Sequence, residues 1–130
     1  MTSHYMKCIV KSSFENLFEA LSKAFGNIYS KKIRKADGSS MGVILGEEYF
    51  FRVNSDVAVT IILEETPFNE TKVEIISSAG GTGYLGISYS AHSAYVHDVK
   101  NFLTHAGFEI LVEKEISYFG KGSGGIFGTI

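Results

Sequence analysis

Cysteine, proline and tryptophan are nearly missing from this sequence, which has one cysteine, one proline and no tryptophan in 130 residues. A single cysteine cannot form a disulfide within the chain, which suits a reducing compartment such as the cytoplasm. No stretch approaches the roughly 18 consecutive apolar residues of a membrane-spanning helix, and the N-terminus lacks the pattern of a secretory signal. We therefore expect a cytoplasmic protein without a membrane partner.

Positive charge is not in excess either, because 12 lysines and arginines stand against 14 aspartates and glutamates. Proteins that bind nucleic acids broadly carry a basic surface, so the formal net charge of −2 argues against nucleic acid as a partner. Hydrophobic residues make up 45% of the chain, enough for one domain with its own core. We predict a single domain over residues 1–119 and a glycine-rich C-terminal tail over residues 120–130.

Two segments have the apolar spacing of amphipathic helices. The first covers residues 14–25, and we expect Ser12 as its N-terminal cap and Gly26 as a left-handed residue at its end. The second covers residues 93–105, with Gly107 as its stop.

The rest of the chain alternates or runs apolar, with many β-branched and aromatic residues, and so predicts six or seven strands. These are residues 4–11, 28–35, 41–53, 57–65, 72–78, 84–90 and 108–118. Several strands in series without helices favour antiparallel pairing. We predict an α+β fold of two layers, a mostly antiparallel sheet with both helices on one face, in the order β-α-β-β-β-β-β-α-β. In the last strand, Glu109, Glu113 and Glu115 are expected to face solvent.

This order of elements is similar to the TATA-binding-protein-like and helix-grip layouts. Residues 73–107, in which Ser-Ala-Gly-Gly precedes a short aromatic strand and an amphipathic helix, also resemble small bacterial domains of unknown function. These resemblances imply a fold and carry no chemistry with them.

Four glycines crowd into residues 77–86, Ser-Ser-Ala-Gly-Gly-Thr-Gly-Tyr-Leu-Gly. Residues 81–86 match the string G-x-G-x-x-G, which binds dinucleotides when a helix follows the glycines directly. Leu85, Ile87 and Tyr89 alternate with smaller residues as a strand does, so we predict no nucleotide cofactor here. A bulge or tight turn between two strands is the simpler interpretation.

Successive backbone N–H groups in such a turn can also form a concave nest for an anion. Hydroxyl side chains in the same stretch would add further hydrogen-bond donors. The candidate ligand-binding residues are Ser77, Ser78, Gly80, Gly81, Thr82 and Gly83.

The one dense basic run contains Lys31, Lys32, Arg34 and Lys35. Clustered Lys and Arg can bind an anion, which makes this run a candidate anion patch. Lysines on an edge strand also prevent edge-to-edge aggregation, and this interpretation needs no ligand.

No metal site or catalytic pair follows from sequence spacing. His92 and His97 lie about 140° apart around a helix, and the chain has no Cys-x-x-Cys or His-x-x-x-His spacing. His4 could meet a helix only through tertiary contact, and scattered polar-face histidines are the simpler expectation. Cys8 alternates with apolar residues and is expected in the core rather than as a nucleophile. We therefore predict no catalytic residue, no metal and no cofactor.

Aromatic residues are abundant, with 7 tyrosines and 10 phenylalanines, more than two helices can easily cover. Those expected outside the helix–sheet core include Tyr5, Tyr29, Tyr49, Phe50, Phe51, Phe68 and Tyr89. We expect a non-catalytic binding module that forms a homodimer through an aromatic sheet face and takes a small anion or another small molecule as ligand. The alternative is a small enzyme whose glycine stretch supplies hydroxyls that a histidine, brought in by the fold, would activate.

Overall fold

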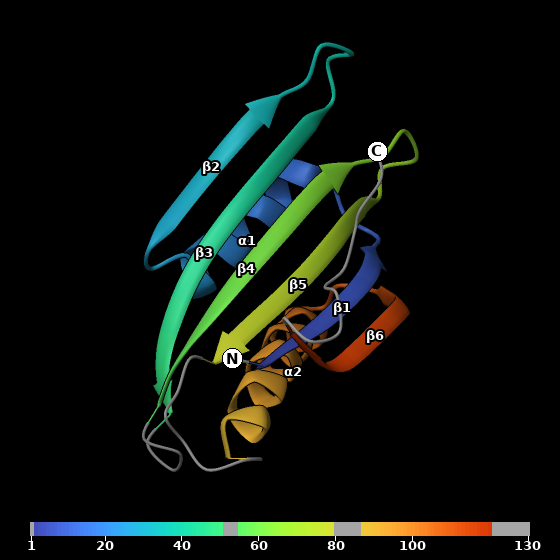
Figure 1. Ribbon diagram of the computed structural model, residues 1–130. Helices are drawn as coiled ribbons and strands as arrows, with labels where there is room; N and C mark the ends of the chain where they lie inside the picture. The colour runs from blue at the N-terminus through green and yellow to red at the C-terminus, as the bar shows by residue number, and fades with distance from the viewer. Residues whose placement is uncertain (1, 51–54, 80–86, 121–130) are drawn as a thin grey trace.

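The computed structural model describes residues 2–50, 55–79 and 87–120, which form one antiparallel sheet and two helices (Figure 1). In chain order the elements are β1 (Thr2–Val10), α1 (Phe14–Phe25), β2 (Tyr29–Arg34), β3 (Ser40–Phe50), β4 (Ser55–Glu65), β5 (Thr71–Ala79), α2 (Ile87–His105) and β6 (Ile110–Gly120). The strands lie in the order β2-β3-β4-β5-β1-β6, and every neighbouring pair is antiparallel. The predicted α+β fold is confirmed, with six strands in the described ranges. Neither described helix is long and apolar enough to cross a membrane.

Both helices lie on the same face of the sheet, α1 over β3 and β4 and α2 over β5 and β1 (Figure 1). The core fills the space between these layers with apolar side chains from the inward positions of the strands and from one stripe of each helix. Fully buried members include Met6, Val10, Phe14, Leu17, Leu21, Ile44, Ile61, Ile75, Val99 and Leu103. Cys8 is 1% exposed within this core, as expected. We call the opposite side of the sheet the open face, since no described helix or strand covers it.

Two glycines on β3 let α1 approach the sheet closely. A Cβ atom at Gly46 would stand 1.8 Å from the carbonyl oxygen of Phe25, and one at Gly42 would stand 2.6 Å from the Phe18 ring. Real Cβ atoms do not come this close to backbone. The absence of a side chain at Gly46 therefore allows the end of α1 to pack directly against β3.

The helix ends differ from the sequence expectation in two respects. Ser13, not Ser12, caps α1, and its hydroxyl accepts a hydrogen bond from the backbone N–H of Asn16 at 3.4 Å. Gly26 has φ −90° rather than a left-handed conformation. Glycine is needed there for space instead, because a Cβ would stand 2.7 Å from the carbonyl oxygen of Ser22. Gly107 does end α2 in a left-handed conformation, with φ +92°.

The predicted strand over residues 84–90 is wrong from residue 87 onward, where α2 begins, and residues 84–86 lie outside the described ranges. A three-residue alternation is too short to separate a strand from the start of a helix. The strand directions are consistent with a helical connection here. Both β5 and β6 are antiparallel to β1, so they run parallel to each other, and parallel strands need a crossover connection.

Candidate functional site

Among the inward side chains of the N-terminal strand that the structure describes, from residue 4 onward, His4 stands out as an ionisable imidazole among core residues. His4, Met6, Cys8 and Val10 all point toward the helices, and His4 is only 1% exposed. A buried imidazole needs hydrogen-bond partners, and His4 finds one on β6, the neighbouring edge strand. The expectation that the histidines are scattered over polar faces is therefore wrong for His4.

The partner is Glu115, and a β-bulge in β6 turns its side chain toward the helices. Cys8 pairs with Val112, but Lys7 pairs with Lys114, so Glu113 has no counterpart on β1. One extra residue reverses the face on which the following side chains lie. Glu115 consequently lies opposite Met6, on the helix-covered side. The sequence prediction that Glu115 faces away from the core is wrong for this reason.

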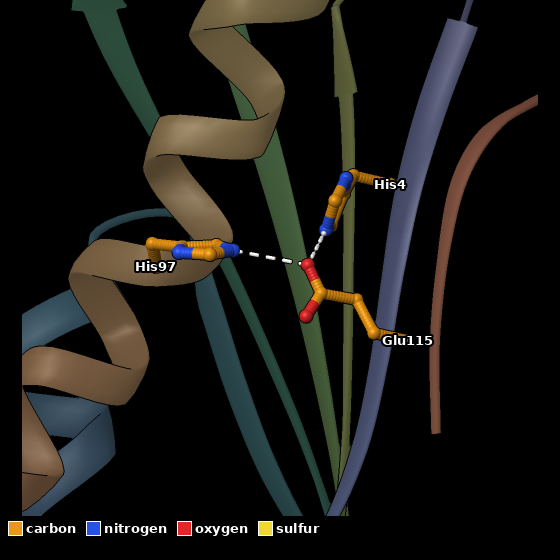
Figure 2. A group of neighbouring side chains, drawn as sticks. All are labelled: His4, His97 and Glu115. Atoms are coloured by element: carbon orange, nitrogen blue, oxygen red, sulfur yellow. Dashed lines mark hydrogen bonds and ion pairs between the residues drawn. The ribbon is translucent and has the colours of Figure 1, made fainter. Parts of the chain in front are cut away.

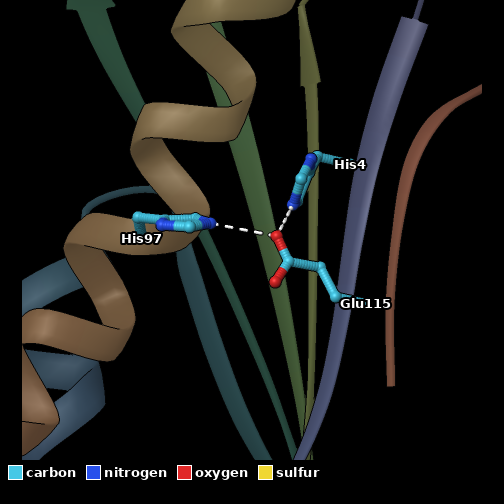
Figure 3. A network of polar contacts seen from close by, with 3 residues as sticks. All are labelled: His4, His97 and Glu115. Carbon is cyan, nitrogen blue, oxygen red and sulfur yellow. Dashed lines mark hydrogen bonds and ion pairs between the residues drawn. The ribbon is translucent and has the colours of Figure 1, made fainter. Parts of the chain in front are cut away.

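Two imidazoles converge on one carboxylate oxygen at this place (Figure 2). Oε2 of Glu115 lies 2.6 Å from Nε2 of His4 and 3.0 Å from Nε2 of His97, a residue of α2. The two rings meet edge to face, with centroids 5.8 Å apart. The site therefore combines side chains from β1, α2 and β6 (Figure 3).

Exposure is graded across the three residues. The side chain of His4 is 2% exposed, that of Glu115 34% and that of His97 47%. Burial alone would raise the pKa of the Glu115 carboxyl, but the hydrogen bonds from His97 and His4 outweigh it and hold that pKa below its usual value. Glu115 is thus an anion at neutral pH. The site is anchored inside by His4 and opens to solvent beside His97.

This cluster offers two imidazole nitrogens and one carboxylate oxygen that all lie within 4.8 Å of one another. Sequence spacing missed it because three separate elements contribute one residue each. One signal was present: a histidine that interrupts the apolar inward positions of a strand needs a buried partner.

The serines of the predicted anion site do not act together. Ser77 lies directly opposite His4 in the β1–β5 pair and is 0% exposed, and its hydroxyl has no hydrogen-bond partner among the described residues. Ser78 lies on the open face, where its hydroxyl is 2.9 Å from that of Ser3. Gly80, Gly81, Thr82 and Gly83 lie outside the described residues, so the anion nest stays a prediction.

The G-x-G-x-x-G string is followed by a helix after all, since α2 begins at Ile87, directly after Gly86. The reason given above for rejecting a dinucleotide site is therefore wrong. A different reason remains. In the fingerprint the helix joins two parallel strands that are neighbours in the sheet, whereas here β1 lies between β5 and β6 and is antiparallel to both.

The basic run lies on β2 and just beyond it, and β2 is an edge strand. Strand alternation places Lys31 on the open face and Lys32 and Arg34 on the other. Most of the run already has partners. Nζ of Lys32 lies 3.0 Å from Glu15, Arg34 donates to the carbonyl oxygen of Gly38 at 3.0 Å, and Lys35 lies 3.5 Å from Glu64. The structure thus does not gather the four side chains into one patch.

The open face carries some of the aromatic residues expected to be uncovered. Tyr29 is 48% exposed there, whereas Tyr5 is 5% exposed and donates to Glu74 at 2.6 Å. Phe68 is 79% exposed in the turn between β4 and β5. The side chains of Tyr49, Phe50, Phe51 and Tyr89 lie outside the described part of the structure.

Comparison with known proteins gives this chain no relatives to argue from. No family model matches the sequence, and no curated protein matches it either. The resemblance of residues 73–107 to small bacterial domains therefore has no family match behind it, and function must be inferred from the geometry.

Proposed function

We propose that the protein is a non-catalytic binding module that forms a homodimer through its open face. The supporting observation is a band of partly exposed or exposed apolar side chains on five neighbouring strands, with charged side chains between some of them. It comprises Tyr29, Ile33, Met41, Val43, Leu45, Ile62, Ile76 and Ile9. Leu111, which pairs with Ile9, extends the band to β6 and is 64% exposed. Exposed apolar side chains gathered on one face and bordered by charged residues are typical of an interaction surface.

A second copy of the chain suits this face in size and charge. The six strands have between 6 and 11 residues, and at about 4.8 Å between strands and 3.3 Å per residue a sheet about nine residues long covers roughly 29 by 30 Å. This is close to the ~800 Å² that each partner buries in a standard interface. Charges of both signs lie among the apolar residues: Lys72 is paired with Glu64, and Lys31 and Glu74 lie on the same face. A two-fold axis can bring opposite charges together across such a face.

Replacing Val43 with lysine should convert the dimer to a monomer, because a charge at the middle of a packed sheet face would lose its hydration. Light scattering coupled to size-exclusion chromatography measures the mass directly. Asn16→Lys is the matched control, since Asn16 is exposed on α1 on the opposite side of the molecule and the substitution adds the same charge. The control should stay dimeric. A wild-type chain that remains monomeric from micromolar to millimolar concentration would contradict the proposal.

A further inference from the structure

We propose that His4, His97 and Glu115 form a binding site for a divalent transition-metal ion, with zinc(II) as the best-suited ion. Two imidazole nitrogens and one carboxylate oxygen are a ligand set that zinc uses in proteins. Three protein ligands leave a fourth position for water. The site is separate from the open face and does not depend on the proposed dimer.

The spacing of the donor atoms suits one shared ion. Ligand atoms around a tetrahedral zinc ion, each 2.0–2.1 Å from the metal, stand about 3.3 Å apart. Here Oε2 of Glu115 stands 2.6 and 3.0 Å from the two imidazole nitrogens, and all donor atoms lie within 4.8 Å. Small movements of the Glu115 and His97 side chains, both partly exposed, would admit the ion. The metal would then take the places of the two N–H protons that now point at the carboxylate.

The fold holds the ligands in place before any ion arrives. His4 lies on β1, a strand with a neighbour on each side, and its side chain is 2% exposed, and the bulge at Glu113 sets the direction of Glu115. His97 is 47% exposed on α2, which gives an ion an entry from solvent. Preorganised ligands on rigid elements lower the cost of ordering a site.

The negative charge of the cluster and a buried hydroxyl beside it also favour a cation. The cluster contains one carboxylate anion, Glu115, whose Oε2 atom both imidazoles contact. Ser77, opposite His4, keeps a fully buried hydroxyl with no partner among the described residues. A metal-bound histidine commonly donates its second ring N–H to a neighbouring oxygen, and Ser77 is the neighbour on β5. We assign Ser77 as a positioning residue for His4.

Isothermal titration of the metal-free 130-residue chain with zinc(II) should show one ion per chain. His97→Ala should weaken binding at least about 100-fold, more than loss of an outer contact costs, and Ser77→Ala about 10-fold. His97 is partly exposed, so its removal should leave the fold intact, which far-UV circular dichroism checks. Cobalt(II) in place of zinc(II) should give the intense visible absorption of a four-coordinate ion, and His97→Ala should abolish it.

His105→Ala is the matched control, because His105 lies on the same helix, is exposed, and has its Nδ1 atom 2.8 Å from the carbonyl oxygen of Asn101. This variant should bind zinc(II) as the wild type does. Absence of saturable binding at 1 mM zinc(II), or equal binding by wild type and His97→Ala, would overturn the proposal. These outcomes are independent of the chain's mass in solution, so failure of the metal site and failure of the dimer are distinguishable.

Discussion

Replacement of Gly46 by alanine is expected to lower the free energy of unfolding by about 3 kcal/mol. The added methyl group would stand 1.8 Å from the carbonyl oxygen of Phe25, and the carbonyl carbon of Phe25 is 3.0 Å away. Backbone cannot move aside as the end of a flexible side chain can, so α1 would have to lift off β3. Because α1 contributes Phe14, Leu17 and Leu21 to the core, such a shift would open contacts beyond the site of substitution.

Two other glycines provide a graded comparison in urea unfolding. At Gly42 the new Cβ would meet the Phe18 ring at 2.6 Å, and a ring can rotate or slide, so the loss should be smaller. At Gly38 nothing lies within 4 Å, but φ is +88°, so only backbone strain of about 1 kcal/mol is expected. The order of loss should be Gly46→Ala, then Gly42→Ala, then Gly38→Ala. A Gly46→Ala protein as stable as the Gly38→Ala protein would contradict this account of how α1 seats.

The thiol of Cys8 is expected to react with a disulfide reagent about 1,000-fold more slowly in the folded chain than in urea at pH 8. Burial, followed by the nearby Glu113 carboxylate, raises the pKa of Cys8 from 9.0 to about 12. The thiolate is the reactive form, and its fraction at pH 8 falls from about one in ten to about one in ten thousand with this pKa. Absorbance of the released thiol follows the reaction, and rapid stoichiometric labelling of the folded protein would contradict the prediction.

The raised pKa of Cys8 also predicts how the free energy of unfolding depends on pH. The folded chain keeps the Cys8 proton up to about pH 12, whereas the unfolded chain loses it near pH 9. Between these values the folded state binds more protons, so the free energy of unfolding falls as pH rises, by about 1.4 kcal/mol per pH unit from this group. Burial also raises the pKa of Tyr95 to about 12 and that of Tyr5 further. Urea unfolding at pH 8, 9.5 and 10.5 would measure the decline, and stability that stays constant above pH 9 would contradict it.

Much of the fold could be predicted from sequence because its signals are local. The apolar period of α1 gave its bounds, residues 14–25, without error. The short turn between β4 and β5 correctly required antiparallel pairing. The start of α2 was misassigned because three alternating residues fit a strand and a helix equally well.

The candidate metal site could not be predicted in the same way. It depends on a single unpaired residue, Glu113, that turns Glu115 inward, and nothing in the sequence around it distinguishes a bulge from regular alternation. It also depends on α2 lying over β1, which brings His97 to His4 across more than 90 residues of chain. Histidine spacing carries no information about such a contact. The local clue was the position of His4, which alternates with Met6, Cys8 and Val10 on the inward side of the first strand.

The place of β1 in the sheet has a consequence for how the chain folds. Its neighbours are β5 and β6, so Met6 pairs with Ile75 on one side and with Glu115 on the other. During synthesis β1 therefore cannot complete its pairing until β5 and then β6 have left the ribosome. Pairings between distant parts of a chain slow folding. Apolar strands that remain unpaired during folding are prone to aggregate. We expect β1 to pair late in folding, when it takes its place between β5 and β6 and completes the sheet.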